Sequence, residues 1–292
     1  MLHTEYEQEM LGQELRIQLS RLSAPRKFTT IGEGKIEARA IRIAEEAGRH
    51  VMSFFLEKVK TRAKTRTSFV SEADESTEEH LRKALASAFP GEAVLGEEFG
   101  LDAEPEGAWW VIDPIDGTSN FLSGLPLFCV SIARMENGRA TLGVTHVPCT
   151  GETYHAVRGH GAFLGEDRLR MDTGDRGRLT TLAMRHSMVR RHPELLDRIG
   201  TDKVRCLGSA CLELAYVAAG RLQALMARHL FLWDCAAGAL FIQEAGGEVH
   251  TAEGRPLFPL ALPARDYESQ RTPIIAGAPY MVKRLENANT SD

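Results

Sequence analysis

The stretch WVIDPIDGTSNF, residues 110–121, is the most informative part of the chain. Its apolar run predicts a strand that delivers two carboxylates, Asp113 and Asp116, three residues apart. Pro114 fixes its own φ and restricts the backbone of Asp113, and the Asp-Gly step that follows predicts a sharp turn. Two carboxylates that converge at a strand end repel each other unless a divalent cation lies between them, and hard oxygen ligands suit Mg²⁺. The stretch therefore favours a magnesium site over an ordinary Asx turn.

The turn after this strand offers further ligands. The carbonyl oxygen of Ile115 is one more candidate for the metal. Gly117 allows the backbone to approach a ligand closely. If a helix begins at this point, the N–H groups of Gly117 and Thr118 could hold a phosphate.

Three acidic residues elsewhere give weaker signals. Glu97 follows a short apolar strand in LGEEFG, Asp234 lies between an apolar strand and an Ala-rich helix, and Asp74 lies at a helix start in SEADESTEE. A solvated turn would explain Glu97, and helix N-capping would explain Asp234 and Asp74. The alternative for Asp74 is a base that orients the Thr118 hydroxyl. The metal interpretation of Glu97 and Asp234 depends on their combination with the other acids.

The composition limits the class of protein. A chain of 292 residues with 43% hydrophobic residues can form one large domain or two fused halves with a sizeable core. The net charge of -5 disfavours nucleic acid as a partner. The five cysteines form no C-x-x-C pair, which indicates a reducing compartment. The N-terminus lacks a signal-peptide pattern and no apolar run reaches the ~18 residues of a membrane span, so we expect a cytoplasmic protein without membrane contact.

The apolar spacing predicts the order of the elements. A long amphipathic helix from Ile36 to about Leu56 is followed by a basic loop with five positive charges from Lys58 to Arg66, and by a helix over 76–89. The loop is either solvated or a mobile segment that attracts phosphate. Strands, a hairpin turning at 136–138, and alternating strands and helices follow, including a helix over 209–219 and a strand over 222–226. This order predicts an α/β (α+β) layered fold with mixed sheets.

The motifs together resemble the inositol monophosphatase family. WVIDPIDGTSNF is preceded by GEE and followed by LWDCAAGALFIQEAGG, and AVRGHGAFLGEDRLR is similar to the family's glycine-punctuated connecting segment. The resemblance spans roughly residues 35–280. It implies an α-β-α-β-α sandwich of the sugar-phosphatase type, with an N-terminal extension at 1–32, an α+β half with most metal ligands at 33–165, and an α/β half completing the site at 166–285.

The resemblance also implies a reaction, the hydrolysis of a small phosphate monoester by a metal-activated water with two to three Mg²⁺ ions per site. It gives each candidate residue a role. The metal ligands are Glu97, Asp113 as the bridge, the carbonyl of Ile115, Asp116 and Asp234. The residues that activate the water are Glu97, Thr118 and Asp74. The residues that contact the substrate are Asp116, Gly117 and Thr118.

The sequence departs from the family pattern at its substrate end. Inositol-specific members carry an acidic residue seven positions before the aspartate of W-D, where this chain has Ala227 followed by Arg228. This departure puts an inositol phosphate in doubt, and Arg228 either faces a second anionic group of the substrate or is simply exposed. Lys64 lies within about one residue of the family's mobile-loop lysine and is a further candidate for substrate contact.

Three functions follow from these observations. The first is a phosphatase for an inositol phosphate or a related polyol or sugar phosphate. The second is the same chemistry on 3′-phosphoadenosine 5′-phosphate, fructose 1,6-bisphosphate or histidinol phosphate. The third is a non-catalytic scaffold that binds an RNA or a transcription complex, which loss of a metal ligand would favour. The expected partners are a small phosphorylated metabolite and, from the resemblance, a second copy of the chain in a homodimer, with no nucleic acid as substrate.

Overall fold

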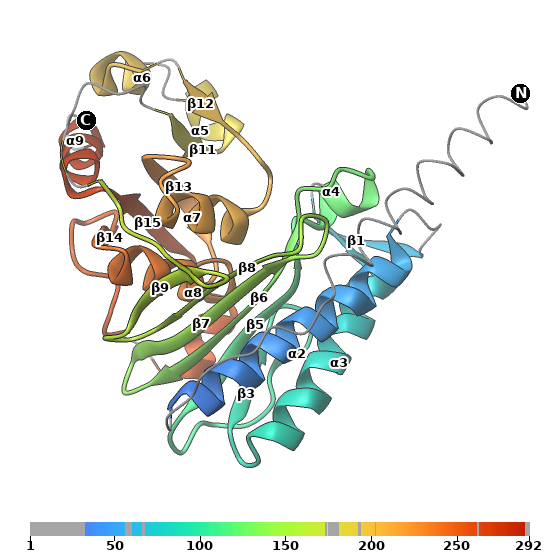
Figure 1. The fold of residues 1–292 in the computed structure, drawn as a ribbon. Helices are drawn as coiled ribbons and strands as arrows, with labels where there is room; N and C mark the ends of the chain where they lie inside the picture. Colours follow the sequence, from blue (N-terminus) through green and yellow to red (C-terminus); the bar gives the residue numbers. More distant parts are fainter. Residues whose placement is uncertain are drawn as a thin grey trace, which may run out of the picture.

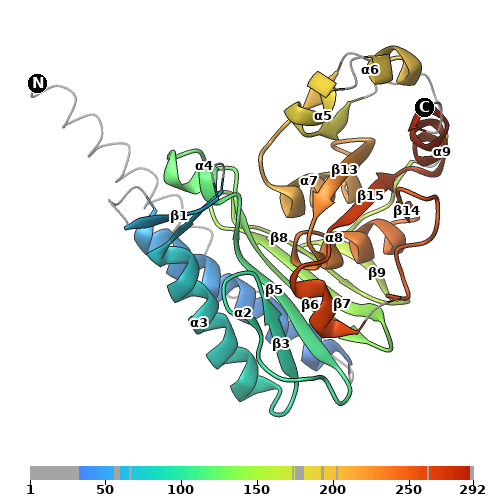
Figure 2. The same ribbon diagram turned by 180° about the vertical axis from the view of Figure 1, so that it is seen from behind.

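The computed structural model describes residues 33–55, 60–65, 68–172, 174, 181–191, 194–201, 203–261 and 263–289. The predicted N-terminal extension, residues 1–32, lies outside the described residues. In the described part, helices and two large sheets stack in layers, as Figures 1 and 2 show from opposite sides.

The larger sheet has eight strands in the order β10-β9-β8-β7-β6-β5-β3-β4. Its pairs are antiparallel except for β3 with β5. Every residue of β5 is buried, which explains the continuous apolar run before the two aspartates. The strands are β3 (Ala93–Gly96), β4 (Gly100–Leu101), β5 (Trp109–Asp116), β6 (Cys129–Glu136), β7 (Arg139–Val147), β8 (Glu152–Val157), β9 (Gly161–Leu164) and β10 (Asp167–Arg168).

Both faces of this sheet are covered by helices. Because successive strand residues point to opposite faces, Trp110 and Ile112 pack with α2 and α3 in one apolar cluster, while Trp109 and Val111 belong to another that includes α7 and α8. Figure 1 shows α2 and α3 side by side on the outer face of the sheet. The four helices are α2 (Glu33–Phe54), α3 (Glu72–Ala88), α7 (Ala210–Ala218) and α8 (Leu232–Glu244).

The smaller sheet has five strands in the order β12-β11-β13-β15-β14 and packs on the other side of α7 and α8. A third apolar cluster joins its outer face to the helices near the C-terminus. The layers therefore run α-β-α-β-α, which confirms the predicted fold class. These elements are β11 (Leu182–Met184), β12 (Val204–Arg205), β13 (Ala224–Leu230), β14 (Glu248–Thr251), β15 (Thr272–Gly277), α5 (His186–Arg191), α6 (Glu194–Ile199), α9 (Pro279–Asn289) and the 3₁₀ helix η1 (Ala264–Glu268). The proposed division into halves at residue 165 stays a prediction.

Several local predictions can be compared with the structure. The hairpin turn is confirmed, since Asn137 and Gly138 have φ values of 51° and 69° between β6 and β7. The helix predicted from residue 76 begins earlier, at Glu72, because Ser71 forms a capping box with Asp74. Part of the predicted basic loop is instead strand β1 (Thr61–Thr65), paired with β2 (Ser68–Ser71). No helix among the described residues is long and apolar enough to cross a membrane.

Candidate active site

A β-bulge in β5 brings Asp113 and Asp116 together. Asp113 pairs with Ser131 of β6 and Asp116 pairs with Cys129, so three steps on β5 match two on β6. In a regular strand, residues three apart point to opposite faces. The extra residue in the bulge turns the side chains of Asp113 and Asp116 to the same face of the sheet. Pro114 fits at the bulge because it has no N–H to donate to a backbone hydrogen bond between the strands. Carboxylate oxygens of Asp113, Asp116 and Asp234 consequently all lie within 4.8 Å of one another.

The side chain of Asp113 is buried without a counter-charge. It is 1% exposed, and neither of its carboxylate oxygens has a hydrogen-bond partner among the described residues. Burial first, and then the negative charges of Glu97, Asp116 and Asp234, raise its pKa well above the usual range. A buried carboxylate without a partner is costly. A cation beside it would relieve that cost, so the donor set fits a hard divalent ion.

Asp116 is held by a segment distant in the sequence. One of its oxygens accepts hydrogen bonds from the Ser209 hydroxyl at 2.5 Å and from the Cys211 N–H at 2.7 Å. Burial raises the pKa of Asp116, and these hydrogen bonds oppose the rise by stabilising the charged form. The two donors, which the sequence interpretation missed, fix one oxygen of Asp116 at the start of α7.

Asp234 lies in the first turn of α8. Its Oδ2 accepts the Phe231 N–H at 2.7 Å. Burial first, and then the charges of Asp116 and Glu97, raise its pKa to about 8. At the third position of the helix, Asp234 satisfies the helix terminus and also belongs to the group of three aspartates.

Asp74 and Thr118 are in direct contact. Thr118 Oγ1 lies 2.9 Å from Asp74 Oδ1 and 3.1 Å from the Ile115 carbonyl oxygen, and its single proton can go to either. Asp74 Oδ2 accepts from both the N–H and the hydroxyl of Ser71, at 2.8 and 2.5 Å. Burial raises the pKa of Asp74, while these hydrogen bonds oppose the rise.

The N-capping alternative for the two weaker aspartates is wrong in detail. The N-cap residues are Ser71 and Phe231, and Asp74 and Asp234 are each the third residue of their helix. Each accepts the backbone N–H of its N-cap residue. Two helix starts thus orient two carboxylates by the same backbone contact.

Glu97 lies in the partly exposed turn after β3. Its charge contributes to the raised pKa of Asp74, Asp113, Asp116 and Asp234. Glu97 is not in the group of three aspartates whose oxygens lie within 4.8 Å of one another. The turn is fixed by Glu78, which is 0% exposed and accepts the N–H groups of Glu98 at 2.7 Å and Phe99 at 3.1 Å.

Glu78 is a second residue that the sequence interpretation missed. Arg82 neutralises it across 2.8 Å. A Cβ at Gly96 would lie 2.2 Å from Glu78 Oε1, so the strand end needs a glycine there. A helical i, i+4 pair of Glu and Arg was the only sequence signal for this support.

Gly117 has φ of +99°, and a Cβ there would lie 2.9 Å from the carbonyl oxygen of Leu127. It precedes the short helix α4 (Thr118–Leu122). Two further predicted substrate contacts, Lys64 and Arg228, lie in β1 and β13. The side chain of Lys64 lies outside the described residues, and Arg228 is exposed in β13 next to an irregularity between Ala227 and Leu230.

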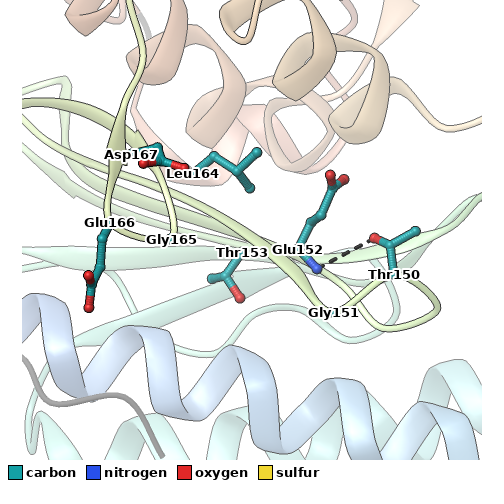
Figure 3. A pocket seen from close by; sticks show the side chains of 8 residues that line it. All are labelled: Thr150, Gly151, Glu152, Thr153, Leu164, Gly165, Glu166 and Asp167. Atoms are coloured by element: carbon teal, nitrogen blue, oxygen red, sulfur yellow. Dashed lines mark hydrogen bonds between the residues drawn. The ribbon is translucent and has the colours of Figure 1, made fainter. Parts of the chain in front are cut away.

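A separate surface hollow lies at the β8 and β9 strand ends, as Figure 3 shows. It has a volume of about 450 Å³ and contains none of the predicted site residues. One of its carboxylates, Glu152, is already paired with Arg221. The lining residues are Thr150, Gly151, Glu152, Thr153, Leu164, Gly165, Glu166 and Asp167.

Comparison with known proteins places the chain in a family. The sequence model of the inositol monophosphatase family matches residues 34–288. A Nus factor SuhB from Xylella fastidiosa is 38% identical over 229 residues, which is 73% of this chain and 81% of the relative. An inositol-1-monophosphatase from Mesorhizobium japonicum is 38% identical over 228 residues, covering 73% and 84%.

Comparison of the fold with solved structures agrees with the sequence comparison. The crystal structure of the extragenic suppressor protein suhB from Bartonella henselae superposes with a TM-score of 0.76 at 31% identity, over 88% of this chain and 99% of that one. The fold is that of a family of metal-dependent phosphatases that act on phosphate monoesters. The chain belongs to the inositol monophosphatase family.

Proposed function

We propose that this protein hydrolyses a small phosphate monoester, an inositol phosphate or a related polyol or sugar phosphate, with Mg²⁺ as its metal. The observation that carries the proposal is Asp113, a fully buried carboxylate with two unpartnered oxygens among three other acidic groups. An isolated buried charge of this kind destabilises a fold unless a ligand compensates it. Oxygen donors alone suit Mg²⁺ rather than a soft metal.

The proposed ligands would hold two to three Mg²⁺ ions. Asp113 has both oxygens available and would bridge. Glu97 and the Ile115 carbonyl would complete the coordination of one ion. Asp116 and Asp234 would complete the coordination of the other. When bound, the metal neutralises the phosphoryl oxygens, lowers the pKa of a bound water and stabilises the leaving oxygen.

Thr118 and Asp74 would orient the attacking water. Asp74 Oδ2 is anchored at Ser71, so its Oδ1 is left to accept the Thr118 proton at 2.9 Å. Thr118 Oγ1 would accept a hydrogen bond from the water; as the water proton moves to Oγ1, the Thr118 proton would move to Asp74 Oδ1. Glu97 would help orient the same water.

The phosphoryl group would be held by the backbone. The N–H groups of Gly117 and Thr118 at the start of α4 would donate to its oxygens, with Asp116 contacting the substrate beside them. The left-handed backbone of Gly117 and the close approach of Leu127 keep this turn free of a side chain. Lys64 and Arg228 are proposed as further substrate contacts.

Other substrates and roles are secondary candidates. Ala227 in place of an acidic residue puts inositol phosphate itself in doubt, and the alternative substrates are 3′-phosphoadenosine 5′-phosphate, fructose 1,6-bisphosphate and histidinol phosphate. A non-catalytic scaffold that binds an RNA or a transcription complex is the further alternative, and the name Nus factor SuhB of the Xylella fastidiosa relative gives it only weak support. We further propose a cytoplasmic homodimer, on the family resemblance and the cysteine pattern.

Phosphate release from a panel of monoesters, with and without Mg²⁺, tests the proposal. The panel holds inositol 1-phosphate, glycerol 2-phosphate, fructose 1,6-bisphosphate, histidinol phosphate and 3′-phosphoadenosine 5′-phosphate. We expect Mg²⁺-dependent release from at least one of them. No release from any, in a protein that binds Mg²⁺, would remove the proposed substrate classes and make the scaffold role the first candidate.

A further inference from the structure

Arg185 and Ala227 are neighbours on adjacent parallel strands. β11 pairs with β13 in parallel register, with Met184 opposite Met226. The residue that follows Met184 is Arg185 and the residue that follows Met226 is Ala227, so these two residues are neighbours. Arg185 follows the carboxyl end of β11, and Ala227 lies in β13 just past the residues that pair with β11. The carboxyl ends of parallel strands are the edge at which open α/β sheets bind ligands.

Ala227 faces the layer of α7 and α8. Ala183, Leu225 and Ala227 belong to the apolar cluster shared with these two helices. This is the face toward which the first turns of α7 and α8 carry Glu213 and Asp234. Arg185 lies one residue past the end of β11, the strand that carries Ala183, and one residue before α5.

The charge of Arg185 reaches the catalytic layer. Burial raises the pKa of both Asp234 and Glu213, and the positive charge of Arg185 opposes the rise in each. The side chain of Arg185 is exposed, and among the described residues it has no ion pair or side-chain hydrogen bond. Arg185 is thus an exposed guanidinium at the end of β11, next to the β13 position at which inositol-specific members carry an acidic residue.

We propose that Arg185, next to Ala227, is a subsite for a second anionic group of the substrate, a phosphate or a carboxylate. The inference rests on the proposed phosphatase function and deepens it. Arginine binds phosphate and carboxylate through two parallel N–H donors. Ala227 brings no negative charge to repel the anion. The substrate class is then a small polyol or sugar that carries two phosphates, or one phosphate and a carboxylate.

Two pairs of substrates test this subsite, since each pair differs by one anionic group. The pairs are glycerol 2-phosphate with 2-phosphoglycerate, and fructose 1-phosphate with fructose 1,6-bisphosphate. In the Mg²⁺-loaded wild type we expect a higher kcat/KM for the more anionic member of at least one pair. The pair that responds distinguishes a carboxylate from a phosphate.

The substitution Arg185→Gln is expected to lower kcat/KM for that preferred member by about 10- to 100-fold, the loss typical of a hydrogen bond to a charged group. The less anionic member should change by less than about threefold. Arg185→Lys, which keeps the charge without the two-donor fork, should be intermediate. Arg49→Gln is the matched control, because Arg49 is an exposed arginine on α2, across the large sheet.

Three results would overturn the subsite: no preference in either pair, an equal loss on both members in Arg185→Gln, or a selective loss in Arg228→Gln instead. Thermal unfolding of each variant confirms that it is folded. If the wild type releases no phosphate at all, the proposed function fails by itself. Calorimetric affinities for the same pairs then test the subsite separately, and equal affinities for both members would contradict it.

Discussion

Replacing Asp113 by asparagine should separate metal binding from folding. Oxygens of Asp113, Asp116 and Asp234 lie within 4.8 Å of one another. At an effective dielectric constant of about 20, two unit charges 4.8 Å apart repel by roughly 3.5 kcal/mol. Protonation relieves part of this repulsion in the metal-free wild type, since the pKa of Asp113 is raised well above its usual range. We therefore expect metal-free Asp113→Asn to be more stable than wild type at pH 8 by about 1–3 kcal/mol, a rise in Tm of about 2–6 °C.

With Mg²⁺ present the order reverses. The wild type should gain stability from bound metal in proportion to RT ln(1 + [Mg²⁺]/Kd), and Asp113→Asn should gain little. Phosphate release by the variant should fall by at least about 100-fold, because the bridging carboxylate is lost. Thermal unfolding in EDTA and in Mg²⁺, together with phosphate release, measures both effects.

The control is Asp167→Asn, which removes an exposed carboxylate on the edge strand β10. It should leave the Mg²⁺-induced rise in Tm and the activity unchanged. The reasoning is refuted if Asp113→Asn keeps substantial turnover, or if Mg²⁺ stabilises it as much as it stabilises wild type.

Three further predictions concern the surrounding groups. Thr118→Val removes the hydroxyl donor to Asp74 and should lower kcat about 100-fold with little change in Tm, whereas Thr118→Ser should retain most activity; equal kcat in all three proteins would contradict the water-orienting role. Gly117→Ala should destabilise the protein by about 1–3 kcal/mol in denaturant unfolding, because the backbone has φ of +99° and the new Cβ meets a carbonyl oxygen; an unchanged midpoint would count against that geometry. The metal-free protein should lose stability as pH rises from about 4 to about 8, because the folded pKa of Asp234 is about 8 and the unfolded value is about 3.9, so the folded state binds the extra proton in that window. Calorimetric scans across this range in EDTA check the slope, and a rise in Tm with pH would have the wrong sign.

The strongest sequence signal for the active site was the stretch WVIDPIDG, because several constraints on its backbone lie next to one another in the sequence. In WVIDPIDG, the apolar strand, Pro114 and the Asp-Gly turn are close in sequence, so their joint meaning is visible without a fold. The fold class followed from the order of elements and the family resemblance, and the structure confirms it. The sequence did not show that a bulge at Pro114 aligns Asp113 with Asp116, because a bulge is defined by the register with β6.

Other parts of the site depend on contacts between distant segments. Ser209 and Cys211 hold Asp116 from 93 and 95 positions away, and no local pattern marks either residue as a donor. Glu78 was hidden because a buried glutamate on a helix looks like a surface residue until its strand-end partners are placed. Arg185 was missed for the same reason, since its neighbour Ala227 is on another strand.

The most direct test of the central claim is an anomalous difference map from a crystal of the protein grown with Mn²⁺ in place of Mg²⁺. The account predicts strong peaks within coordination distance, about 2.0–2.3 Å, of the carboxylate oxygens of Asp113, with Asp116 and Asp234 on the same ions. A map with no peak at Asp113, or with Mn²⁺ bound only elsewhere, would contradict the claim that this buried carboxylate cluster is the metal centre of the enzyme.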